Sequence, residues 1–410
     1  MSNRIVVVGA GQAGLQTAEA LRSGGFAGEL TLLGDEPYAP YHRPPLSKAW
    51  LAGELDAAQL AMRAPEALTR KGITLRAGTR VAALDLAART VTLADGSALS
   101  YDGLALATGA LARPLPVPGG NAEGVHALRT RDDATAIAAG LDACAASGRP
   151  VVVVGGGFIG LEVAATARKR GLPVTVLESA PRLLGRVLAA SMSDWYAQLH
   201  AGHGVQLVLG AQLASIRLEA GRAVAVTLAD GRQFPAGLIV VGIGVFANDS
   251  LARAAGIVCD RGIVVDACTR TSAPGVVAAG DCTARRLPEG SLLRLESVQN
   301  AVEQGRSAAA ALLGQERPFV AAPWFWSDQY DTKLQMAGLS AGADGWVVRG
   351  DMQAGHFSVY HFRGAALIAV DSVNAGKDHL LARKLLEARV SPTREQAGDP
   401  AFDLAALLKA

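Results

Sequence analysis

Two short runs of β-branched residues, each followed by a cluster of glycines, stand out in the hydrophobic pattern of the chain. Ile5–Val8 precedes a Gly-Ala-Gly-Gln-Ala-Gly turn at residues 9–14, and Val151–Val154 precedes Gly-Gly-Gly-Phe-Ile-Gly at residues 155–160. An alanine-rich stretch with helical periodicity follows in both copies, and then a second apolar run that leads into an acidic residue, Asp35 or Glu178. Each copy therefore predicts a strand, a tight turn, a helix and a second parallel strand.

The similarity between the two halves continues downstream. The sequence Val-Thr-Leu-Ala-Asp-Gly at residues 91–96 recurs at residues 226–231, and in both its Asp-Gly pair predicts a hairpin turn. A buried strand is expected next in each half, at residues 103–107 and 238–241. The pattern therefore predicts two similar domains, each a βαβ unit with a small antiparallel excursion.

The spacing of the glycines predicts two dinucleotide sites. The first glycine permits the tight turn, the second lets the backbone approach a pyrophosphate, and the third lets the helix pack closely on the strand. The helix N-terminus then offers free N–H groups to the phosphates, and the acid after the second strand accepts from a ribose. The predicted contacts are Gly9, Gly11, Gly14 and Asp35 in the first copy and Gly155, Gly157, Gly160 and Glu178 in the second.

Two sites in one chain suggest one resident cofactor and one that comes and goes. The first domain is completed late, by an apolar strand that ends at Asp281 and a helical pattern from about Val298. Asp281 can reach the ribitol of a flavin, and the N-terminus of that helix can stabilise a reduced isoalloxazine. The inserted second domain would carry NAD. Glu178 favours NADH because a carboxylate repels a 2′-phosphate, although Arg182 leaves some ambiguity.

The charge, the distribution of cysteine and histidine, and the length of the apolar runs argue against several other classes of protein. The formal net charge of +2 is too balanced for a nucleic-acid binder, which would show a clustered basic face. The four cysteines are scattered and the seven histidines do not cluster, so we expect no disulfide scaffold, iron–sulfur cluster or other metal site. Apolar runs are too short for a membrane span and glycines interrupt any signal-peptide core, so a cytoplasmic protein without membrane contact is expected.

Five segments together resemble the FAD-dependent ferredoxin reductases of bacterial oxygenase systems. They are Arg-Pro-Pro-Leu-Ser-Lys at 43–48, Ala-Thr-Gly at 107–109, residues 155–162, Ala-Gly-Asp at 279–281 and Pro-Trp-Phe-Trp-Ser-Asp-Gln at 323–329. The resemblance implies an α/β, glutathione-reductase-like fold with two Rossmann-like dinucleotide-binding domains and a C-terminal α+β domain. Its implied boundaries are 1–112 with 246–320 for FAD, 113–245 for NAD and 321–410 for the C-terminal domain.

The resemblance also implies roles for individual residues. Lys48 corresponds to the family lysine near the reactive edge of the flavin, and Glu162 to a position beside the nicotinamide, where the two could form an ion pair. Trp326 resembles the aromatic residue near the flavin on the ferredoxin side. The further FAD positions are Ala13, Arg43, Val81, Thr108, Gly109, Arg129 and Val298, and the further NAD positions are Ile159 and Gly244. Two departures are the Val-Phe-Ala-Asn sequence after Gly244 and Gln335, where the family has a docking lysine.

The chemistry implied is hydride transfer from NADH to FAD, followed by single-electron transfer to a [2Fe–2S] ferredoxin of an oxygenase. No cysteine lies in residues 41–48, where a disulfide reductase of this fold has its redox pair, so no thiol exchange is expected. Aromatic hydrocarbon catabolism is the implied setting. Arg63, Arg306 and Lys333 are candidates for a ferredoxin-docking surface. The alternatives are an NADH oxidase or quinone reductase, and a non-catalytic redox-sensing flavoprotein.

Overall fold

The computed structural model describes residues 3–409, and the chain divides into two compact units. Unit 1 contains Met1–His42, Asp56–Leu111 and Val245–Ala321, and unit 2 contains Arg43–Leu55, Ala112–Gly244 and Ala322–Ala410. Residues 43–55, which lie inside the segment expected to bind FAD, group with unit 2. The finer three-domain boundaries stay a prediction.

Unit 1 is built on a five-stranded parallel sheet of order β19-β7-β1-β2-β3. Two smaller sheets, β4-β5-β6 and β18-β20-β21, accompany it, and β8 pairs with β17. The strands are β1 (Arg4–Val8), β2 (Glu29–Leu33), β3 (Thr74–Arg76), β4 (Val81–Asp85), β5 (Thr90–Leu93), β6 (Ala98–Ser100), β7 (Gly103–Leu106), β8 (Ala110–Ala112), β17 (Val245–Ala247), β18 (Ile263–Val265), β19 (Val276–Ala278), β20 (Thr283–Arg286) and β21 (Leu292–Leu293).

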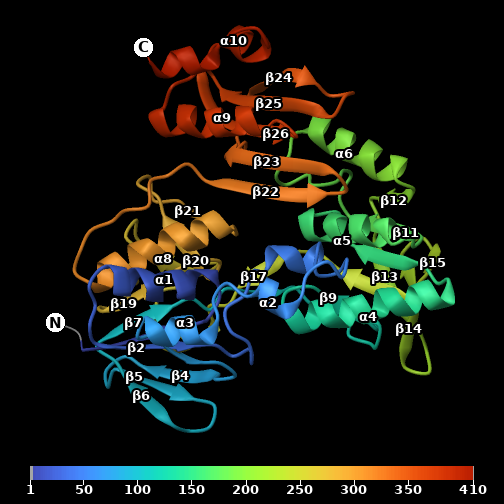
Figure 1. Cartoon of the computed structure of the whole chain (residues 1–410). Helices are drawn as coiled ribbons and strands as arrows, with labels where there is room; N and C mark the ends of the chain where they lie inside the picture. Colours follow the sequence, from blue (N-terminus) through green and yellow to red (C-terminus); the bar gives the residue numbers. More distant parts are fainter. Residues whose placement is uncertain (1–2, 410) are drawn as a thin grey trace. The chain divides into compact units, whose positions relative to one another are not determined.

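Helices α1 and α8 lie side by side against this sheet (Figure 1). Ile5 and Val7 of β1 point into the core beneath these helices, whereas Val6 and Val8 point into a second core shared with β5 and β7. Burial on both faces explains the uninterrupted β-branched run, since a parallel strand covered on both sides has no polar face. The helices of unit 1 are α1 (Gln12–Ser23), α2 (Ala57–Leu60), α3 (Pro65–Arg70), α7 (Ser250–Ala254) and α8 (Val298–Leu312).

Unit 2 contains a similar five-stranded parallel sheet and, in its C-terminal part, a further antiparallel sheet. Its parallel sheet has the order β12-β11-β10-β16-β9, with the antiparallel sheet β13-β14-β15 beside it. The strands are β9 (Val125–Ala127), β10 (Val151–Val154), β11 (Val174–Glu178), β12 (Val205–Leu209), β13 (Leu213–Glu219), β14 (Arg222–Leu228), β15 (Gln233–Pro235) and β16 (Leu238–Val241). The helices are η1 (Pro44–Ser47), α4 (Arg131–Ser147), α5 (Phe158–Lys169) and α6 (Ala190–Gly202).

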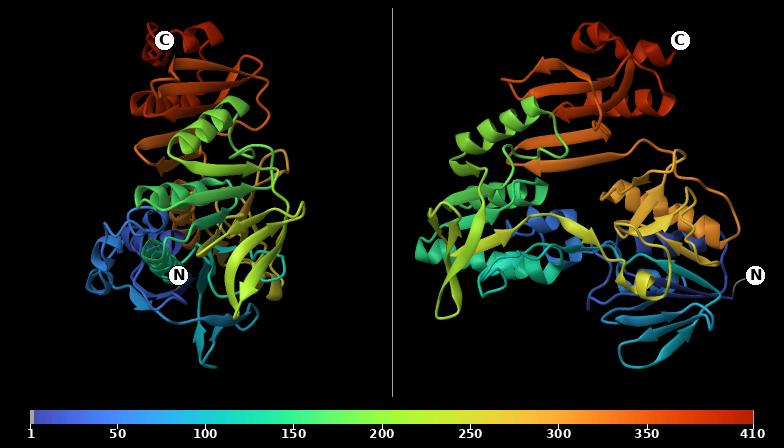
Figure 2. Two further views of the ribbon diagram at one scale, coloured as in Figure 1. Left: turned by 90° about the vertical axis from the view of Figure 1, so that its right-hand side faces the viewer. Right: turned by 180° about the vertical axis from the view of Figure 1, so that it is seen from behind.

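The C-terminal part of unit 2 is an antiparallel sheet of order β22-β23-β26-β25-β24, drawn in orange and red in Figure 2. Its core joins Tyr360, Phe362 and Val370 to Ala382 and Leu385 of α9. The elements are β22 (Trp324–Gln329), β23 (Thr332–Gly338), β24 (Gly345–Asp351), β25 (His356–Arg363), β26 (Ala366–Val373), α9 (Gly376–Ala388), α10 (Arg394–Gly398) and η2 (Leu404–Leu408). The predicted α/β class with two Rossmann-like domains and a C-terminal α+β region is confirmed.

Candidate functional site

The first glycine turn of unit 1 leaves no room for side chains at two of its three glycines. Gly9 has a φ of 108°, and a Cβ there would lie 2.1 Å from the carbonyl oxygen of Ala107. A Cβ on Gly14 would lie 1.8 Å from the carbonyl oxygen of Gly9. Gly11, by contrast, has no atom within 4 Å of such a Cβ. The turn is thus tightly packed on the protein side and open at the helix N-terminus.

The ends of three neighbouring parallel strands meet at this turn. A Cβ on Gly280, after β19, would lie 2.9 Å from the Cβ of Ala13, so the segment leading to Asp281 adjoins α1. After β7, the Thr108 hydroxyl donates to the carbonyl oxygen of Asn248 at 2.6 Å, and Gly109 accepts from the Asn248 N–H at 2.9 Å. Unit 1 therefore brings the predicted FAD residues of β1, β7 and β19 to one edge of its sheet, the edge where open α/β sheets bind ligands.

The second glycine turn, in unit 2, has nearly the same geometry. Gly155 has a φ of 109°, and its Cβ would lie 2.5 Å from the carbonyl oxygen of Gly242. A Cβ on Gly160 would lie 2.1 Å from the carbonyl oxygen of Gly155. The nearest atom to a Cβ on Gly157 is 3.8 Å away, so the middle glycine again faces open space.

These two turns fit dinucleotide phosphates. The N-cap residues of α1 and α5 are Gly11 and Gly157, which provide no side-chain cap, whereas α8 is capped by the Ser297 hydroxyl. An uncapped helix N-terminus next to open space presents free N–H groups to an anion. Gly9–Gly14 could therefore hold the pyrophosphate of FAD, and Gly155–Gly160 that of NADH.

The acid after the second strand of unit 2 is held beside the glycine turn. The Glu178 carboxylate accepts from the backbone N–H of Gly156 at 2.6 Å and of Ala180 at 2.7 Å. The Arg182 guanidinium is directed to its own loop instead, where it donates to the carbonyl oxygens of Leu188 at 2.6 Å and Gly185 at 2.7 Å. A fixed negative charge and an engaged arginine at this position both disfavour a 2′-phosphate.

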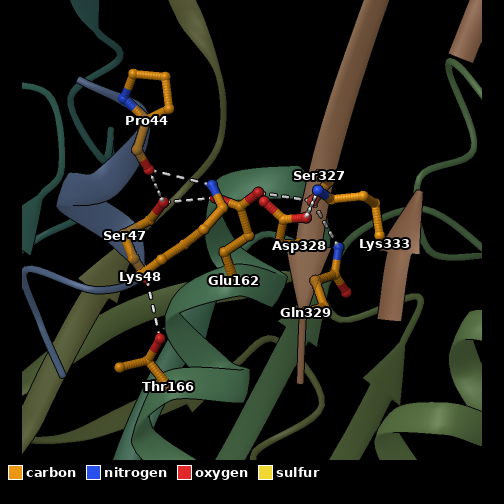
Figure 3. Close-up of polar contacts among 9 residues, drawn as sticks. All are labelled: Pro44, Ser47, Lys48, Glu162, Thr166, Ser327, Asp328, Gln329 and Lys333. Carbon is orange, nitrogen blue, oxygen red and sulfur yellow. Dashed lines mark hydrogen bonds and ion pairs between the residues drawn. The ribbon is translucent and has the colours of Figure 1, made fainter. Parts of the chain in front are cut away.

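Glu162 stands at the centre of a polar cluster in unit 2 (Figure 3). Its side chain is 2% exposed. One carboxylate oxygen, Oε2, accepts from Lys48 Nζ at 2.7 Å and from the Ser47 hydroxyl at 2.5 Å. The other, Oε1, accepts from the Ser327 hydroxyl at 2.6 Å. Because a buried carboxylate needs both counter-charge and donors, this arrangement satisfies Glu162 from η1 and β22 together.

Further contacts attach the segment 43–55 to unit 2. The Thr166 hydroxyl of α5 donates to the Ser47 carbonyl oxygen at 3.0 Å, and Arg43 donates to the Arg129 carbonyl oxygen at 2.7 Å. The Arg131 guanidinium lies 5.2 Å from the centre of the Trp50 ring. Lys48 is therefore positioned by the same unit that carries Glu162.

The remaining predicted residues are divided between the two units. Asp35, Val81 and Val298 lie in unit 1, and Arg43, Lys48, Arg129, Trp326 and Gly244 lie in unit 2. Ile159 is exposed at the start of α5, and the Trp326 ring lies 5.6 Å from that of Trp324. A common FAD site made from both sets stays a prediction.

The three candidate docking cations have acidic neighbours. Arg63 contacts Glu19 at 2.9 Å, Arg306 contacts Glu303 at 2.7 Å, and Lys333 Nζ lies 4.0 Å from Asp328. Each cation is 45–58% exposed and remains accessible to a partner. The local field at each is weaker than its charge alone suggests.

Ser47, Ser327 and Gln329 were not among the predicted site residues, although all three lie in motifs that indicate the family. Alternation along β22 places Phe325, Ser327 and Gln329 on one face of the strand. Phe325 on that face contacts Phe158 of α5, with ring centres 4.9 Å apart. The signal that could have identified Ser327 and Gln329 is their position on the same face of the strand as a packed aromatic residue.

Comparison with known proteins decides the family. Residues 3–305 match the family described as pyridine nucleotide-disulphide oxidoreductase, and residues 324–408 match the reductase C-terminal domain. This chain belongs to the pyridine nucleotide-disulphide oxidoreductases. It is 48% identical to rhodocoxin reductase of Rhodococcus erythropolis, over 98% of this chain and 93% of that protein.

Two further relatives cover the chain at similar identity. The biphenyl dioxygenase system ferredoxin–NAD(+) reductase component of Paraburkholderia xenovorans (strain LB400) is 40% identical, over 100% of this chain and 99% of that protein. The crystal structure of the covalent putidaredoxin reductase–putidaredoxin complex matches with a TM-score of 0.95 and 41% identity, over 99% and 98% of the two chains. The predicted resemblance to ferredoxin reductases of oxygenase systems is confirmed.

Among residues 3–409, no helix is both long and apolar enough to cross a membrane. No three His, Cys, Asp or Glu side chains are grouped as a metal site in that range. Cys144, Cys268 and Cys282 are buried free thiols and Cys259 is a partly buried one, and burial raises the pKa of Cys144, Cys259 and Cys282.

Proposed function

We propose that this chain is an NADH:ferredoxin reductase that supplies electrons to an oxygenase. The observation that carries the proposal is the full-length match to ferredoxin reductases, which includes the C-terminal domain as well as both nucleotide-binding regions. FAD, when bound, accepts the hydride of NADH and releases its two electrons one at a time, which suits a [2Fe–2S] acceptor.

The residues of each unit have distinct tasks in this proposal. Gly9, Gly11 and Gly14 admit the FAD pyrophosphate, and Asp281 binds the ribitol chain from the neighbouring strand end. Gly155–Gly160 admits the NADH pyrophosphate, and Glu178 binds the ribose next to the adenine and selects against NADPH. Hydride transfer depends on orientation more than on acid–base chemistry, so the protein contributes mainly by positioning.

Lys48 and Glu162 supply charge and orientation near the reacting rings. Glu162 fixes the Lys48 ammonium group at 2.7 Å, and a fixed cation favours a negatively charged reduced cofactor. Arg63, Arg306 and Lys333 would raise the encounter rate with an acidic ferredoxin more than they raise affinity. We place the reaction in the cytoplasm, where NADH is available.

An anaerobic titration with NADH tests the function. The purified flavoprotein should bleach with NADH, and cytochrome c should be reduced rapidly only after a [2Fe–2S] ferredoxin is added. NADPH at the same concentration should bleach the flavin much more slowly. Equal turnover with quinone or oxygen alone would contradict the proposal and favour an NADH oxidase or quinone reductase. Bleaching that takes minutes and gives a long-lived charge-transfer band would instead indicate a redox sensor.

A further inference from the structure

The hydrogen bonds of Glu162 continue past Ser327 into the interior of unit 2. The side-chain amide nitrogen of Gln329 donates to the Ser327 hydroxyl at 3.1 Å, and the Gln329 amide oxygen lies 2.8 Å from Nε2 of His200. Nδ1 of His200 lies 3.1 Å from the Tyr330 hydroxyl. We call Glu162, Ser327, Gln329, His200 and Tyr330 the Glu162 series.

The direction of every hydrogen bond in the series follows from its carboxylate end. A carboxylate only accepts, so the single proton of Ser327 points to Glu162, and Ser327 must accept from Gln329. Gln329 therefore turns its NH₂ group to Ser327 and its oxygen to His200. That oxygen needs a donor, which places the His200 proton on Nε2. Nδ1 is then unprotonated and accepts from the Tyr330 hydroxyl.

Burial supports this single arrangement. Ser327 and His200 are 0% exposed and Gln329 is 1% exposed, so water does not offer these groups alternative partners. Burial also lowers the pKa of His200 to about 4, despite the hydrogen bond to Gln329, which raises it. The imidazole is thus neutral at neutral pH and carries one N–H, as the series requires.

The far end of the series is anchored as firmly as the carboxylate end. Tyr330 has a φ of 58°, which is unusual for a residue with a side chain, and it lies in the turn between β22 and β23. Lys169 donates to its carbonyl oxygen at 2.8 Å, and the His203 ring stacks on its ring with centres 3.6 Å apart. The ends of α5 and α6 thereby hold Tyr330 in this conformation.

We propose that Ser327, Gln329, His200 and Tyr330 are positioning residues that set the orientation of the Glu162 carboxylate and, through it, of the Lys48 ammonium group. Fixing Oε1 to Ser327 directs Oε2 toward Lys48 and Ser47. A primary amide does not titrate in the physiological range, so Gln329 makes the series an orienting device and not a path for protons. The effect on cofactor chemistry rests on the proposed function, whereas the hydrogen-bond directions do not.

The tautomer of His200 tests the directions without any change to the enzyme. Two-dimensional ¹H–¹⁵N spectra of the ¹⁵N-histidine-labelled holoenzyme at pH 7, assigned with His200→Gln, should show a neutral ring protonated on Nε2. A cationic ring, or a proton on Nδ1, would overturn the proposal. In Gln329→Met the acceptor for Nε2 is lost, and the proton should move to Nδ1, where the Tyr330 hydroxyl can accept it. An unchanged tautomer in a folded Gln329→Met protein would also count against the series.

Loss of the Ser327 hydroxyl tests the positioning effect. In Ser327→Ala, the rate constant for flavin reduction by NADH in anaerobic stopped-flow should fall about tenfold, as expected for a lost hydrogen bond to a charged group. The FAD midpoint potential should become more negative, because Lys48 is held less firmly near the reduced ring. Ser327→Thr, which keeps the hydroxyl, should recover most of both values.

Ser358→Ala is the matched control. Ser358 is 0% exposed and lies in the same sheet, but its hydroxyl contacts the Asp378 carboxylate at 3.1 Å and the Ser372 hydroxyl at 2.9 Å, both outside the series. If Ser327→Ala and Ser358→Ala have the same rate constant and midpoint potential, the positioning role is wrong. Neither measurement involves a ferredoxin. If the wild-type protein reduces no ferredoxin, the proposed electron acceptor is wrong, but this test of the positioning role still applies.

Discussion

The two glycine turns differ little from each other, but the helices that follow them have different surroundings. Counted from the last glycine of each turn, Gln16 of α1 and Glu162 of α5 occupy equivalent positions. Gln16 packs on α8, where a Cβ on Gly305 would lie 2.9 Å from the Gln16 Cβ. Glu162 instead accepts three hydrogen bonds from η1, Lys48 and β22. The two turns therefore have nearly the same geometry, and the elements packed on the next helical turn decide whether a charged cluster is added.

This difference follows from what covers each helix. In unit 1 the neighbour is α8, whose buried face includes Ala301, Gly305 and Ala308, and these small residues allow close helix packing. In unit 2 the neighbours are the 43–48 segment and strand β22, which bring Lys48, Ser47 and Ser327 to one carboxylate. Two nucleotide-binding units with nearly the same glycine turn can thus differ in charge, because different elements pack on the helix that follows the turn.

The largest effects are expected when the third glycine of each turn is replaced by alanine. The two replacements should impair the binding of different cofactors. The new methyl group would meet a backbone oxygen at 1.8 Å in Gly14→Ala and 2.1 Å in Gly160→Ala. Overpacking typically costs about 1–3 kcal/mol and occasionally more, and a clash with a backbone oxygen is expected at the upper end of that range. Gly14→Ala should be purified without FAD, as judged by flavin absorbance, whereas Gly160→Ala should keep FAD and raise the KM for NADH more than tenfold.

Gly11→Ala is the control for this pair. Its Cβ would meet no protein atom within 4 Å, and its backbone is extended, so the protein should fold normally. Only FAD affinity should fall, because the methyl group would enter the space proposed for the pyrophosphate. A Gly14→Ala protein with full FAD content would contradict the tight packing described here.

Glu162→Gln should separate chemistry from binding. The change keeps the shape of the side chain but removes the counter-charge of Lys48, and it should cost about 2 kcal/mol of unfolding free energy. FAD content should be unchanged, while flavin reduction by NADH should slow at least tenfold in stopped-flow measurements. Gln16→Ala in unit 1 removes packing only, so it should lower the unfolding free energy without a matching loss of the reduction rate constant.

The sequence predicted much of the fold because both halves repeat a local pattern. The β-branched runs, the glycine spacing and the Asp-Gly turns each depend on neighbouring residues, and β1, β10, β5-β6 and β14-β15 form where expected. The Glu162 series was not predicted, because it joins residues 162, 200 and 327 through long-range packing of α5, α6 and β22. No local sequence pattern specifies that these three residues come into contact, although the polar positions in β22 indicate an inward polar face.

Glu178→Gln should change coenzyme preference by a smaller factor. Removing the charge that is fixed by Gly156 and Ala180 should shift the ratio of kcat/KM for NADPH over NADH upward by about tenfold. Arg182→Ala should lower the melting temperature, because two hydrogen bonds to its own loop and one to Ser193 of α6 are lost, and should leave the ratio unchanged. A fall in NADPH activity in Arg182→Ala would instead assign Arg182 to the 2′-phosphate.

The smallest expected effect is an acid sensitivity that is larger in unit 2 than in unit 1. Burial lowers the pKa of His200 and of His379 in unit 2 to about 4, below the ordinary value of 6.5, and lowers the pKa of His42 in unit 1 to a smaller extent. Below pH 6.5 the unfolded chain binds protons that the native histidines do not, so stability is complete above this pH and is lost as the pH falls toward 4. At pH 5.5 the loss should be about 1 kcal/mol for each of the two histidines.

Urea unfolding at pH 7.5 and pH 5.5 measures this loss, and hydrogen exchange locates it. His200→Gln should reduce the difference between the two pH values by about 1 kcal/mol, because glutamine does not titrate. His356→Gln, at an exposed position of the same unit, should leave the difference unchanged. Protection factors, which correct for the intrinsic pH dependence of exchange, should fall at pH 5.5 in α6 and β22, which meet at His200 and Gln329, before they fall in β1 and α1. Equal acid losses in His200→Gln and the wild type would show that His200 binds its proton in the native state, and the neutral imidazole that the Glu162 series requires would then be wrong.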